Sequence, residues 1–361
     1  MISPICFEKE WIENLRKEKG SERINPPLLE KMIHALYLLQ NLKMQGLDFV
    51  FKGGTSLVLL LEDANRFSVD IDIIVNKPCG EPSARSEIED LLDRIVKDAN
   101  FTSWKLDEAR SYREGIPKAH YKLEYQPKYD PSGYILLDIL FEKNYYPRLI
   151  EVPVRSKWIK TEETINVTVP DIDSIAGDKL TAFAPNTTGI KYGADKELEI
   201  IKQLFDVGHL FERVESFRVL AKSFEAFVSE ETAYRGLSIG TNEVLSDIIE
   251  TSKTIARRDR NTAEPSKSNF SELKKGIQQF GPFLISGSFH LDEAIAASSK
   301  AAYLAAKLSV KDHSPLKRFD GSDISGLLIE DPNWNFLNKL KKLPDKSAFY
   351  YWHQAAILLT A

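Results

Sequence analysis

The stretch from Leu47 to Val75 constrains the fold of this chain more than any other part of the sequence. It reads LDFVFKGGTSLVLLLEDANRFSVDIDIIV, which predicts a strand, a tight glycine turn, a helix, a loop and a second strand. Successive side chains of a strand alternate between its two faces, so Asp70 and Asp72 should project together from one face. The apolar residues between and after them should enter a core on the other face. Two carboxylates placed in this way can hold a divalent metal ion.

The glycine turn at Gly53 and Gly54 is suited to binding a triphosphate. The first N–H groups of a helix have no partner within the helix and carry a partial positive charge that attracts anions. Glycine has no Cβ atom, so the backbone can adopt a positive φ and approach a phosphate closely. We expect the hydroxyls of Thr55 and Ser56 to donate to phosphate oxygens and Lys52 to add positive charge. The alternative is that this turn only connects a strand to a helix.

The D-x-D pair of Asp70 and Asp72 predicts a site for magnesium or manganese. Two like charges about 5 Å apart repel by roughly 3 kcal/mol at an effective dielectric near 20, and a cation relieves this repulsion. Magnesium is commonly held by one or two carboxylates together with the phosphates of a substrate. A solvated sheet face is the alternative interpretation of the pair. The order of glycine turn, helix and D-x-D strand favours the metal site.

Four short motifs follow one another along the chain. They are GGTSL at 53–57, RFSVDIDI at 66–73, DKLTA at 178–182 and LFDVGHL at 204–210. In this order they resemble the DNA polymerase beta type nucleotidyltransferase superfamily, and within it the AbiEii/AbiGii family of bacterial toxin-like nucleotidyltransferases. The resemblance implies an α+β nucleotidyltransferase fold with a mixed β-sheet flanked by helices, followed by a helical C-terminal domain. Beyond about residue 212 no motif matches the family.

The apolar run YILLDILF at 134–141 contains one carboxylate, Asp138. This run and residues 120–125 predict a β-hairpin, and an ionised carboxylate is costly to bury without a partner. The resemblance implies that Asp138 joins Asp70 and Asp72 from a neighbouring strand, as the third carboxylate of the metal site. The alternatives are an edge-strand Asp138 that faces solvent, and Glu124 as the third carboxylate.

The resemblance also implies roles for basic residues and their partners. Lys179, oriented by Asp206, would reach the triphosphate. In the alternative interpretation Lys179 pairs with Asp178 or Asp206 on the surface of a helix bundle. Arg66 and Ser68 match the family run R-x-S-x-D-x-D and would support the same ligand, although Arg66 could instead be a surface cation.

Length and periodicity predict two domains. Single cores stop growing at about 250 to 300 residues, and the chain has 361. We expect a nucleotidyltransferase catalytic domain at 1–170 and a helical domain at 171–361 that contributes Lys179 and Asp206 to the site. Helical periodicity predicts helices near 26–46 and 84–98 in the first part, and near 171–184, 195–211, 288–310 and 348–359 in the second.

Composition is that of an intracellular enzyme. Cys6 and Cys79 are the two cysteines of the chain, and their separation indicates neither a disulfide framework nor a zinc site. No stretch approaches the roughly 18 apolar residues of a membrane helix, and the N-terminus lacks the apolar region of a signal peptide. We therefore expect a cytoplasmic protein without a membrane partner.

The net charge of −5 does not indicate a nucleic-acid-binding protein as a whole. Residues 251–276, however, carry seven basic and three acidic residues, so 7 − 3 gives a local charge of +4. Together with Lys179 this stretch could form a trough for RNA, with Arg257, Arg258 and Arg260 touching the acceptor backbone. A solvated loop is the alternative, because Pro265 and the polar residues around it are typical of loops.

These observations predict a metal-dependent nucleotidyltransferase that moves a nucleoside monophosphate from a nucleoside triphosphate to an acceptor hydroxyl. The resemblance implies the 3′ end of tRNA as the acceptor and a cognate antitoxin as a partner. Three other classes stay open. They are a small-molecule nucleotidyltransferase of the aminoglycoside-modifying kind, a phosphotransferase on the same scaffold, and a non-catalytic module that binds a partner.

Overall fold

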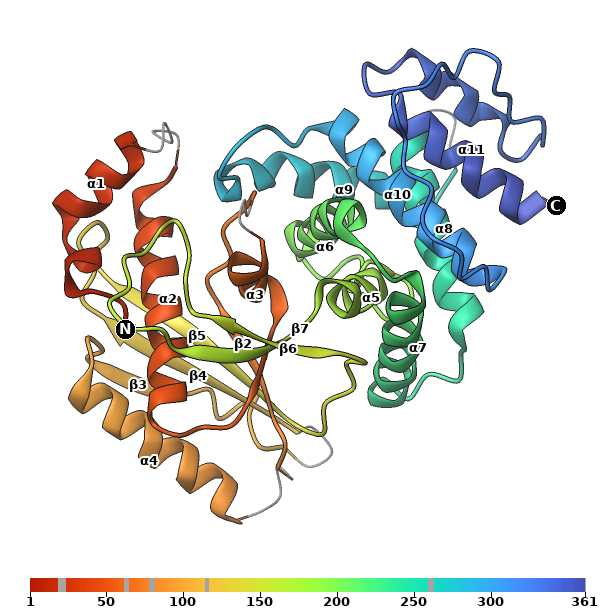
Figure 1. The fold of residues 1–361 in the computed structure, drawn as a ribbon. Helices are drawn as coiled ribbons and strands as arrows, with labels where there is room; N and C mark the ends of the chain where they lie inside the picture. Colours follow the sequence, from red (N-terminus) through yellow and green to blue (C-terminus); the bar gives the residue numbers. More distant parts are fainter. Residues whose placement is uncertain (19–23, 62–64, 78–81, 114–116, 259–262, 361) are drawn as a thin grey trace. The chain divides into compact units, whose positions relative to one another are not determined.

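The computed structural model describes residues 1–18, 24–61, 65–77, 82–113, 117–258 and 263–360. The chain divides into two compact units (Figure 1). The first, an α/β unit, comprises Met1–Asn144, Arg148–Asp171 and Pro282–Gly287. The second, a helical unit, comprises Tyr145–Pro147, Ile172–Gly281 and Ser288–Ala361. The α+β class predicted from the sequence is confirmed.

A mixed sheet forms the centre of the α/β unit. Within the described residues it has seven strands in the order β3-β4-β5-β2-β1-β7-β6. The strands are β1 (Val50–Lys52), β2 (Ile71–Val75), β3 (Ser103–Leu106), β4 (Lys118–Tyr125), β5 (Gly133–Phe141), β6 (Leu149–Pro153) and β7 (Asn166–Pro170). β2 runs parallel to β5, β1 runs parallel to β7, and the other neighbours are antiparallel. The predicted hairpin of β4 and β5 is present.

Four α-helices flank this sheet (Figure 1), counted over the described residues of the α/β unit. They are α1 (Lys9–Glu18), α2 (Pro26–Met44), α3 (Gly53–Leu60) and α4 (Pro82–Asp98), preceded by the short 3-10 helix η1 (Pro4–Phe7). α2 starts with two prolines, which suit the first turn of a helix, and it packs against β5. Leu29, Met32 and Leu36 of α2 are fully buried. Burying each such side chain stabilises the fold by about 1.5 to 3 kcal/mol, so the apolar stripe of α2 holds it on the sheet.

A late segment of the chain, 282–287, also belongs to the α/β unit. The N–H of Phe67 donates to the carbonyl of Phe283 at 2.9 Å, and the N–H of Ile285 donates to the carbonyl of Asn65 at 2.9 Å. The side chain of Ile285 is buried in the core of the same unit. These contacts fix the loop that leads into β2.

The helical unit contains α5 (Ile172–Ala182), α6 (Glu197–Leu210), α7 (Phe217–Tyr234), α8 (Thr241–Arg257), α9 (Ser266–Phe280), α10 (Leu291–Ser309) and α11 (Ser347–Thr360). Two 3-10 helices accompany them, η2 (Phe211–Arg213) and η4 (Asn335–Lys342). A third, η3 (Gly281–Phe283), starts at the end of this part of the unit and continues into the segment 282–287 of the α/β unit. α10 packs against α6, α8 and α11, and α5 packs against α7. A Cβ atom on Gly177 of α5 would lie 2.5 Å from the carbonyl oxygen of Leu220, so α5 and α7 approach as closely as they do because this residue is glycine. The predicted helical C-terminal region is confirmed.

Candidate functional site

The glycine turn lies directly against the D-x-D strand. β1 ends at Lys52, which pairs with Asp72 across the antiparallel β1–β2 ladder, and α3 begins at Gly53. Gly53 has a φ of +77°, and a Cβ atom there would lie only 2.2 Å from Oδ2 of Asp72. The position therefore requires glycine for two reasons, its backbone conformation and the contact with the carboxylate. The turn and the carboxylate form one local structure.

Arg66 and Ser68 approach the second glycine of the turn. A Cβ atom on Gly54 would lie 2.6 Å from Nη2 of Arg66 and 2.8 Å from Oγ of Ser68. Arg66 is only 7% exposed, and its Nη1 donates to the carbonyl of Phe67 at 3.2 Å. The interpretation of Arg66 as a surface cation is therefore wrong. A buried guanidinium beside the start of a helix adds fixed positive charge where an anion is expected.

The side chains of Thr55 and Ser56 form hydrogen bonds within the fold. Both residues are fully buried. The hydroxyl of Thr55 donates to the carbonyl of Asp70 at 2.6 Å, and the hydroxyl of Ser56 donates to the carbonyl of Gly53 at 2.8 Å. We expected these hydroxyls to donate to phosphate, but they are directed at backbone carbonyls. The prediction of phosphate binding by this turn therefore depends on its backbone N–H groups, and Thr55 instead ties α3 to the D-x-D segment.

Asp138 lies beside Asp72 on the neighbouring strand. In the parallel β2–β5 pairing Asp72 is opposite Asp138, so the two side chains project from the same face of the sheet. β5 lies between β4 and β2, and the interpretation of Asp138 as an edge-strand residue is therefore wrong. Its side chain is 37% exposed, which leaves the carboxylate open to a ligand.

His120 holds this carboxylate, a role that the motifs of the sequence do not indicate. The residue faces Asp138 across the β4–β5 ladder. Its Nδ1 lies 2.7 Å from Oδ1 of Asp138, a hydrogen bond in which the ring N–H donates to the carboxylate. A single histidine in a strand carries no sequence signal for this role. Only the register of the β4–β5 hairpin, in which residue 120 lies opposite residue 138, indicates this contact.

Glu124, the alternative third carboxylate, lies elsewhere in the sheet. It faces Tyr134 near the other end of the hairpin. Its carboxylate accepts hydrogen bonds from Lys105 at 3.0 Å and from Ser103 at 2.9 Å. These bonds, that of Lys105 first, lower the pKa of Glu124 to about 2. Glu124 is therefore part of a surface ion cluster and not of the candidate site.

The three carboxylates do not form a preformed metal cage. Among the residues that the structure describes, no group of three or more Asp, Glu, His or Cys side chains is arranged to hold a metal ion. Asp72 lies against the glycine turn, Asp138 is bonded to His120, and Asp70 precedes β2. The assignment of all three carboxylates to one metal site therefore stays a prediction. Two neighbouring carboxylates nevertheless fit magnesium, because this ion commonly takes one or two carboxylates and completes its shell with water and phosphate oxygens.

Lys179 and Asp206 form a buried ion pair in the helical unit. Nζ of Lys179 on α5 lies 3.1 Å from Oδ2 of Asp206 on α6 and donates to Oε1 of Gln203 at 3.0 Å. Their side chains are 8% and 2% exposed, so the expected pairing is found, but not on the bundle surface. Asp178 instead accepts a hydrogen bond from the hydroxyl of Tyr146. Removing either member of the pair would leave a buried charge without its partner, which is strongly destabilising.

The comparison with protein families gives a match over residues 38–309, to the nucleotidyl transferase AbiEii toxin of type IV toxin–antitoxin systems. The matched range covers most of the chain and spans every candidate residue described above, from Lys52 to Asp206. The chain belongs to the AbiEii family. A comparison with curated proteins gave no match. The family resemblance inferred from the four motifs is confirmed, and the chain is a nucleotidyltransferase of the toxin type by family.

The basic stretch at 251–276 of this AbiEii chain is divided by its folding. Lys253 is buried, with its ammonium 2.8 Å from Glu250 and 3.9 Å from the ring centre of Trp334. Lys275 pairs with Glu197 at 2.5 Å. These two lysines are therefore committed to contacts within the helical unit, and a trough along the whole stretch stays a prediction.

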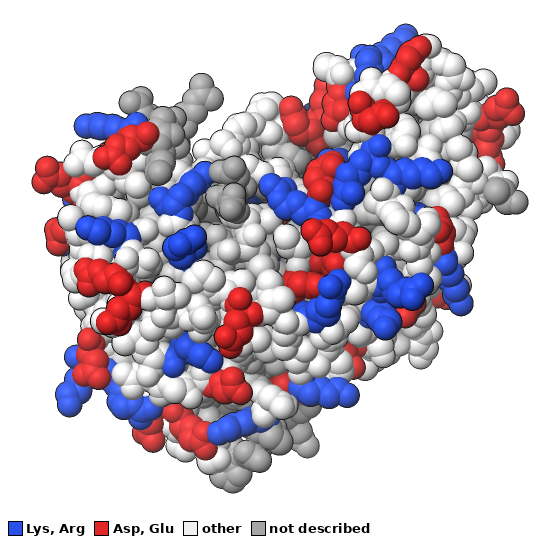
Figure 2. Space-filling view, in the orientation of Figure 1, with Lys and Arg blue, Asp and Glu red and all other residues white. Residues whose placement is uncertain are grey.

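The stretch also contains three arginines. Arg257 and Arg258 line a cavity at the end of α8, whereas Arg260 and Asp259 lie outside the described residues. On the face shown in Figure 2, basic and acidic side chains are interspersed over both units. Among the described residues, no helix is both long enough and apolar enough to cross a membrane.

Proposed function

We propose that this chain transfers a nucleoside monophosphate from a nucleoside triphosphate to a hydroxyl of an RNA acceptor, with the 3′ end of tRNA as the expected position. The acceptor oxygen forms a bond to the α-phosphorus, the bond from that phosphorus to the α–β bridging oxygen breaks, and pyrophosphate leaves. One observation carries the proposal. Asp72 lies beside Asp138 on a parallel strand and touches the glycine turn at the start of α3.

Different residues of the α/β unit would bind the phosphates, hold the metal ion and orient the acceptor. The backbone N–H groups at the start of α3 would bind the phosphates, and Arg66 would add charge beside Gly54. Asp72 and Asp138, with Asp70 before them, would hold magnesium or manganese. When bound, this ion neutralises phosphate charge and lowers the pKa of a coordinated hydroxyl. Asp138 would also orient the acceptor, since His120 fixes one of its carboxylate oxygens.

Other parts of the proposal follow from the family. Lys179 with Asp206 would support the triphosphate from the helical unit. The AbiEii match to type IV toxin–antitoxin systems supports a cognate antitoxin as a partner. We expect the reaction to take place in the cytoplasm, where nucleoside triphosphates and tRNA are found together.

A labelling experiment tests the proposed function. The purified chain is incubated with tRNA, magnesium and each nucleoside triphosphate in turn, labelled either at the α- or at the γ-phosphate. We expect label in RNA from the α-position alone. Label from the γ-position would indicate a phosphotransferase, and transfer to an added aminoglycoside but not to RNA would indicate the small-molecule class.

A pair of matched variants connects the activity to the site. Asp72→Asn removes one carboxylate charge from the candidate site and should reduce transfer to background. Asp48→Asn removes the same charge from an exposed position in the same unit and should leave transfer unchanged. Full activity of Asp72→Asn at saturating magnesium would exclude Asp72 as a metal ligand.

A further inference from the structure

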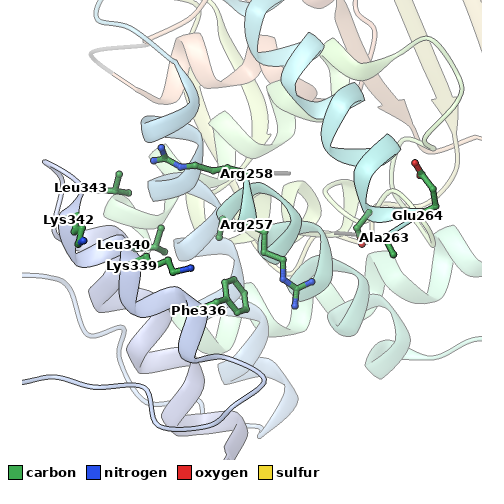
Figure 3. A pocket seen from close by; sticks show the side chains of 11 residues that line it. Arg257, Arg258, Ala263, Glu264, Phe336, Lys339, Leu340, Lys342 and Leu343 are labelled. Carbon is green, nitrogen blue, oxygen red and sulfur yellow. The ribbon is translucent and has the colours of Figure 1, made fainter. Parts of the chain in front are cut away.

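A cavity of about 950 Å³ opens between parts of the helical unit that are distant in sequence. One wall is the end of α8 with Arg257 and Arg258, a second is the start of α9, and a third is η4 with Phe336, Lys339 and Lys342. Figure 3 shows these side chains around the cavity, with Arg257 and Arg258 extending in different directions. The cavity lies wholly within the helical unit.

The charged residues that line this cavity are mostly basic. Among the described residues that line it, four are cations and one, Glu264, is an anion. Arg258 is neutralised locally, because its Nη2 lies 2.5 Å from Oδ1 of Asp292. Three cations are then left to consider, namely Arg257, Lys339 and Lys342.

These three cations have no carboxylate partner among the residues that the structure describes. The guanidinium of Arg257 lies 4.7 Å from the ring centre of Phe336, a cation–π contact that holds both side chains in the lining. Lys339 and Lys342 are exposed on η4. Like charges gathered around one cavity repel each other, so an anion placed among them is bound favourably.

The chemistry of the cavity favours a nucleic acid, and its size leaves room for more than one phosphate. Pockets for small ligands are about 300 to 1,000 Å³, so this cavity lies at the upper end and exceeds what a single phosphate needs. Sites for single-stranded nucleic acids combine a basic groove with an aromatic side chain on which a base can stack. Phe336 supplies the aromatic surface here, on the same 3-10 helix as the two lysines and in contact with Arg257.

We propose that this cavity binds a single-stranded segment of RNA, with its phosphates on Arg257, Lys339 and Lys342 and a base against Phe336. The proposal rests on the proposed function in one respect, the identity of the polymer as the RNA acceptor. It adds a binding site in the helical unit whose residues take no part in the transfer step.

Direct binding of a short fluorescent single-stranded RNA to the full chain tests this proposal. The titration is made in EDTA without nucleoside triphosphate, over a range of salt concentrations. Lys339→Ala with Lys342→Ala should weaken binding about tenfold. The slope of log affinity against log salt should become shallower by about 1.4, because each phosphate contact on a single strand contributes roughly 0.7. Phe336→Leu should weaken binding with the salt slope unchanged.

The matched control is Lys222→Ala with Lys317→Ala, two exposed lysines of the same unit. This pair removes the same charge and should leave both affinity and slope as in the wild type. An equal loss in the control would show that only net charge matters and would overturn the proposal. Wild-type affinity in the variant of Lys339 and Lys342 would overturn it as well. Competition by polyglutamate as strong as that by unlabelled RNA would also overturn the proposal, because the site would then bind acidic polymers in general.

The outcome for this cavity and the outcome for the proposed function can be told apart. RNA binding that depends on Lys339 and Lys342 in a chain without transfer activity would support the cavity and contradict the proposed function. Transfer to tRNA together with RNA binding that does not depend on these lysines would support the proposed function and contradict the cavity proposal.

Discussion

At the scale of single residues, the candidate site depends on the contacts of Gly53 and His120 with two carboxylates. The two positions differ in which substitutions they allow. Gly53 has no room for a side chain, because Asp72 fills the space where a Cβ atom would lie. His120 has a role that another hydrogen-bond donor of similar reach could take, because its Nδ1–H donates a single bond to Asp138. These two positions therefore give different predictions.

Gly53→Ala should abolish transfer and also reduce stability. Gly46→Ala is the matched control, because Gly46 also has a positive φ, +87°, but a Cβ atom added there would meet nothing within 4 Å. Both variants should lose about 1 to 2 kcal/mol of unfolding free energy from backbone strain. Only Gly53→Ala should lose activity, because only there must the carboxylate of Asp72 move. Denaturant titration and the labelling assay measure the two effects; equal activity in both variants would contradict the contact.

His120→Ala should lower the rate of transfer by about 10- to 100-fold, the effect typical of removing a group that orients a metal ligand. His120→Asn keeps an N–H donor near the position of Nδ1 and should restore much of the rate. A role in packing alone predicts instead that both variants lose activity in proportion to their loss of stability. Kinetics and denaturant titration of the two variants separate these cases, with His313→Ala, an exposed histidine, as the control.

At the scale of elements, the interface between α2 and the sheet contains a buried histidine, His34. The ring of His34 stacks on Tyr125 of β4 at 3.7 Å, and its Nδ1–H donates to the carbonyl of Glu30 at 2.9 Å. Burial lowers the pKa of His34 to about 4, whereas histidine in an unfolded chain titrates near 6.5. The folded α/β unit therefore contains the neutral ring over most of the acidic range.

This histidine should make the α/β unit less stable as the pH falls. The unfolded chain takes up a proton near pH 6.5 and the folded chain only near pH 4, so stability is lost in that window as pH decreases. Between roughly pH 7.5 and pH 5 the loss should be about 2 kcal/mol. His34→Phe, which cannot be protonated, should show a correspondingly smaller change. Urea titrations at both pH values measure the difference between the two proteins, and parallel pH profiles would contradict it.

Elements with a strong local pattern could be predicted from the sequence. The apolar stripe of α2 and the alternation of β4 and β5 gave their positions to within a few residues. β6 could not be recognised, because its residues are mostly exposed and carry no alternation. The neighbours of β1 could not be predicted either, since Val50 pairs with Thr168 from more than a hundred residues away. For the same reason the local sequence could not predict that the Thr55 hydroxyl donates to the carbonyl of Asp70.

At the scale of the whole molecule, the α/β unit is not continuous in sequence. Residues 282–287 return to it after most of the helical unit, and their backbone bonds the loop that carries Arg66. The anchor of this segment is Ile285, which is 7% exposed in the core. The position of the Arg66 loop thus depends on a side chain far along the chain.

Ile285→Ala should loosen this contact without unfolding the sheet. Truncating a buried isoleucine costs about 2 to 5 kcal/mol, and the loss should fall first on the segment and the loop it holds. Hydrogen exchange should therefore speed up at the amide of Phe67, which donates to Phe283. The amide of Ile73 within β2 serves as the internal reference. Equal acceleration at both amides would mean that the whole unit is affected and that the segment has no separate role.

The late return of residues 282–287 also sets an order for biosynthesis. When a ribosome has made residue 171, all the described strands of the sheet exist, yet the carbonyl that binds the N–H of Phe67 belongs to a residue not yet translated. At about 5 to 20 residues per second, that residue follows roughly 5 to 20 s later. A nascent chain therefore completes the surroundings of Arg66 only after the helices α5 to α9 have been synthesised. Products released before residue 282 contain the glycine turn and all three aspartates but lack this last support.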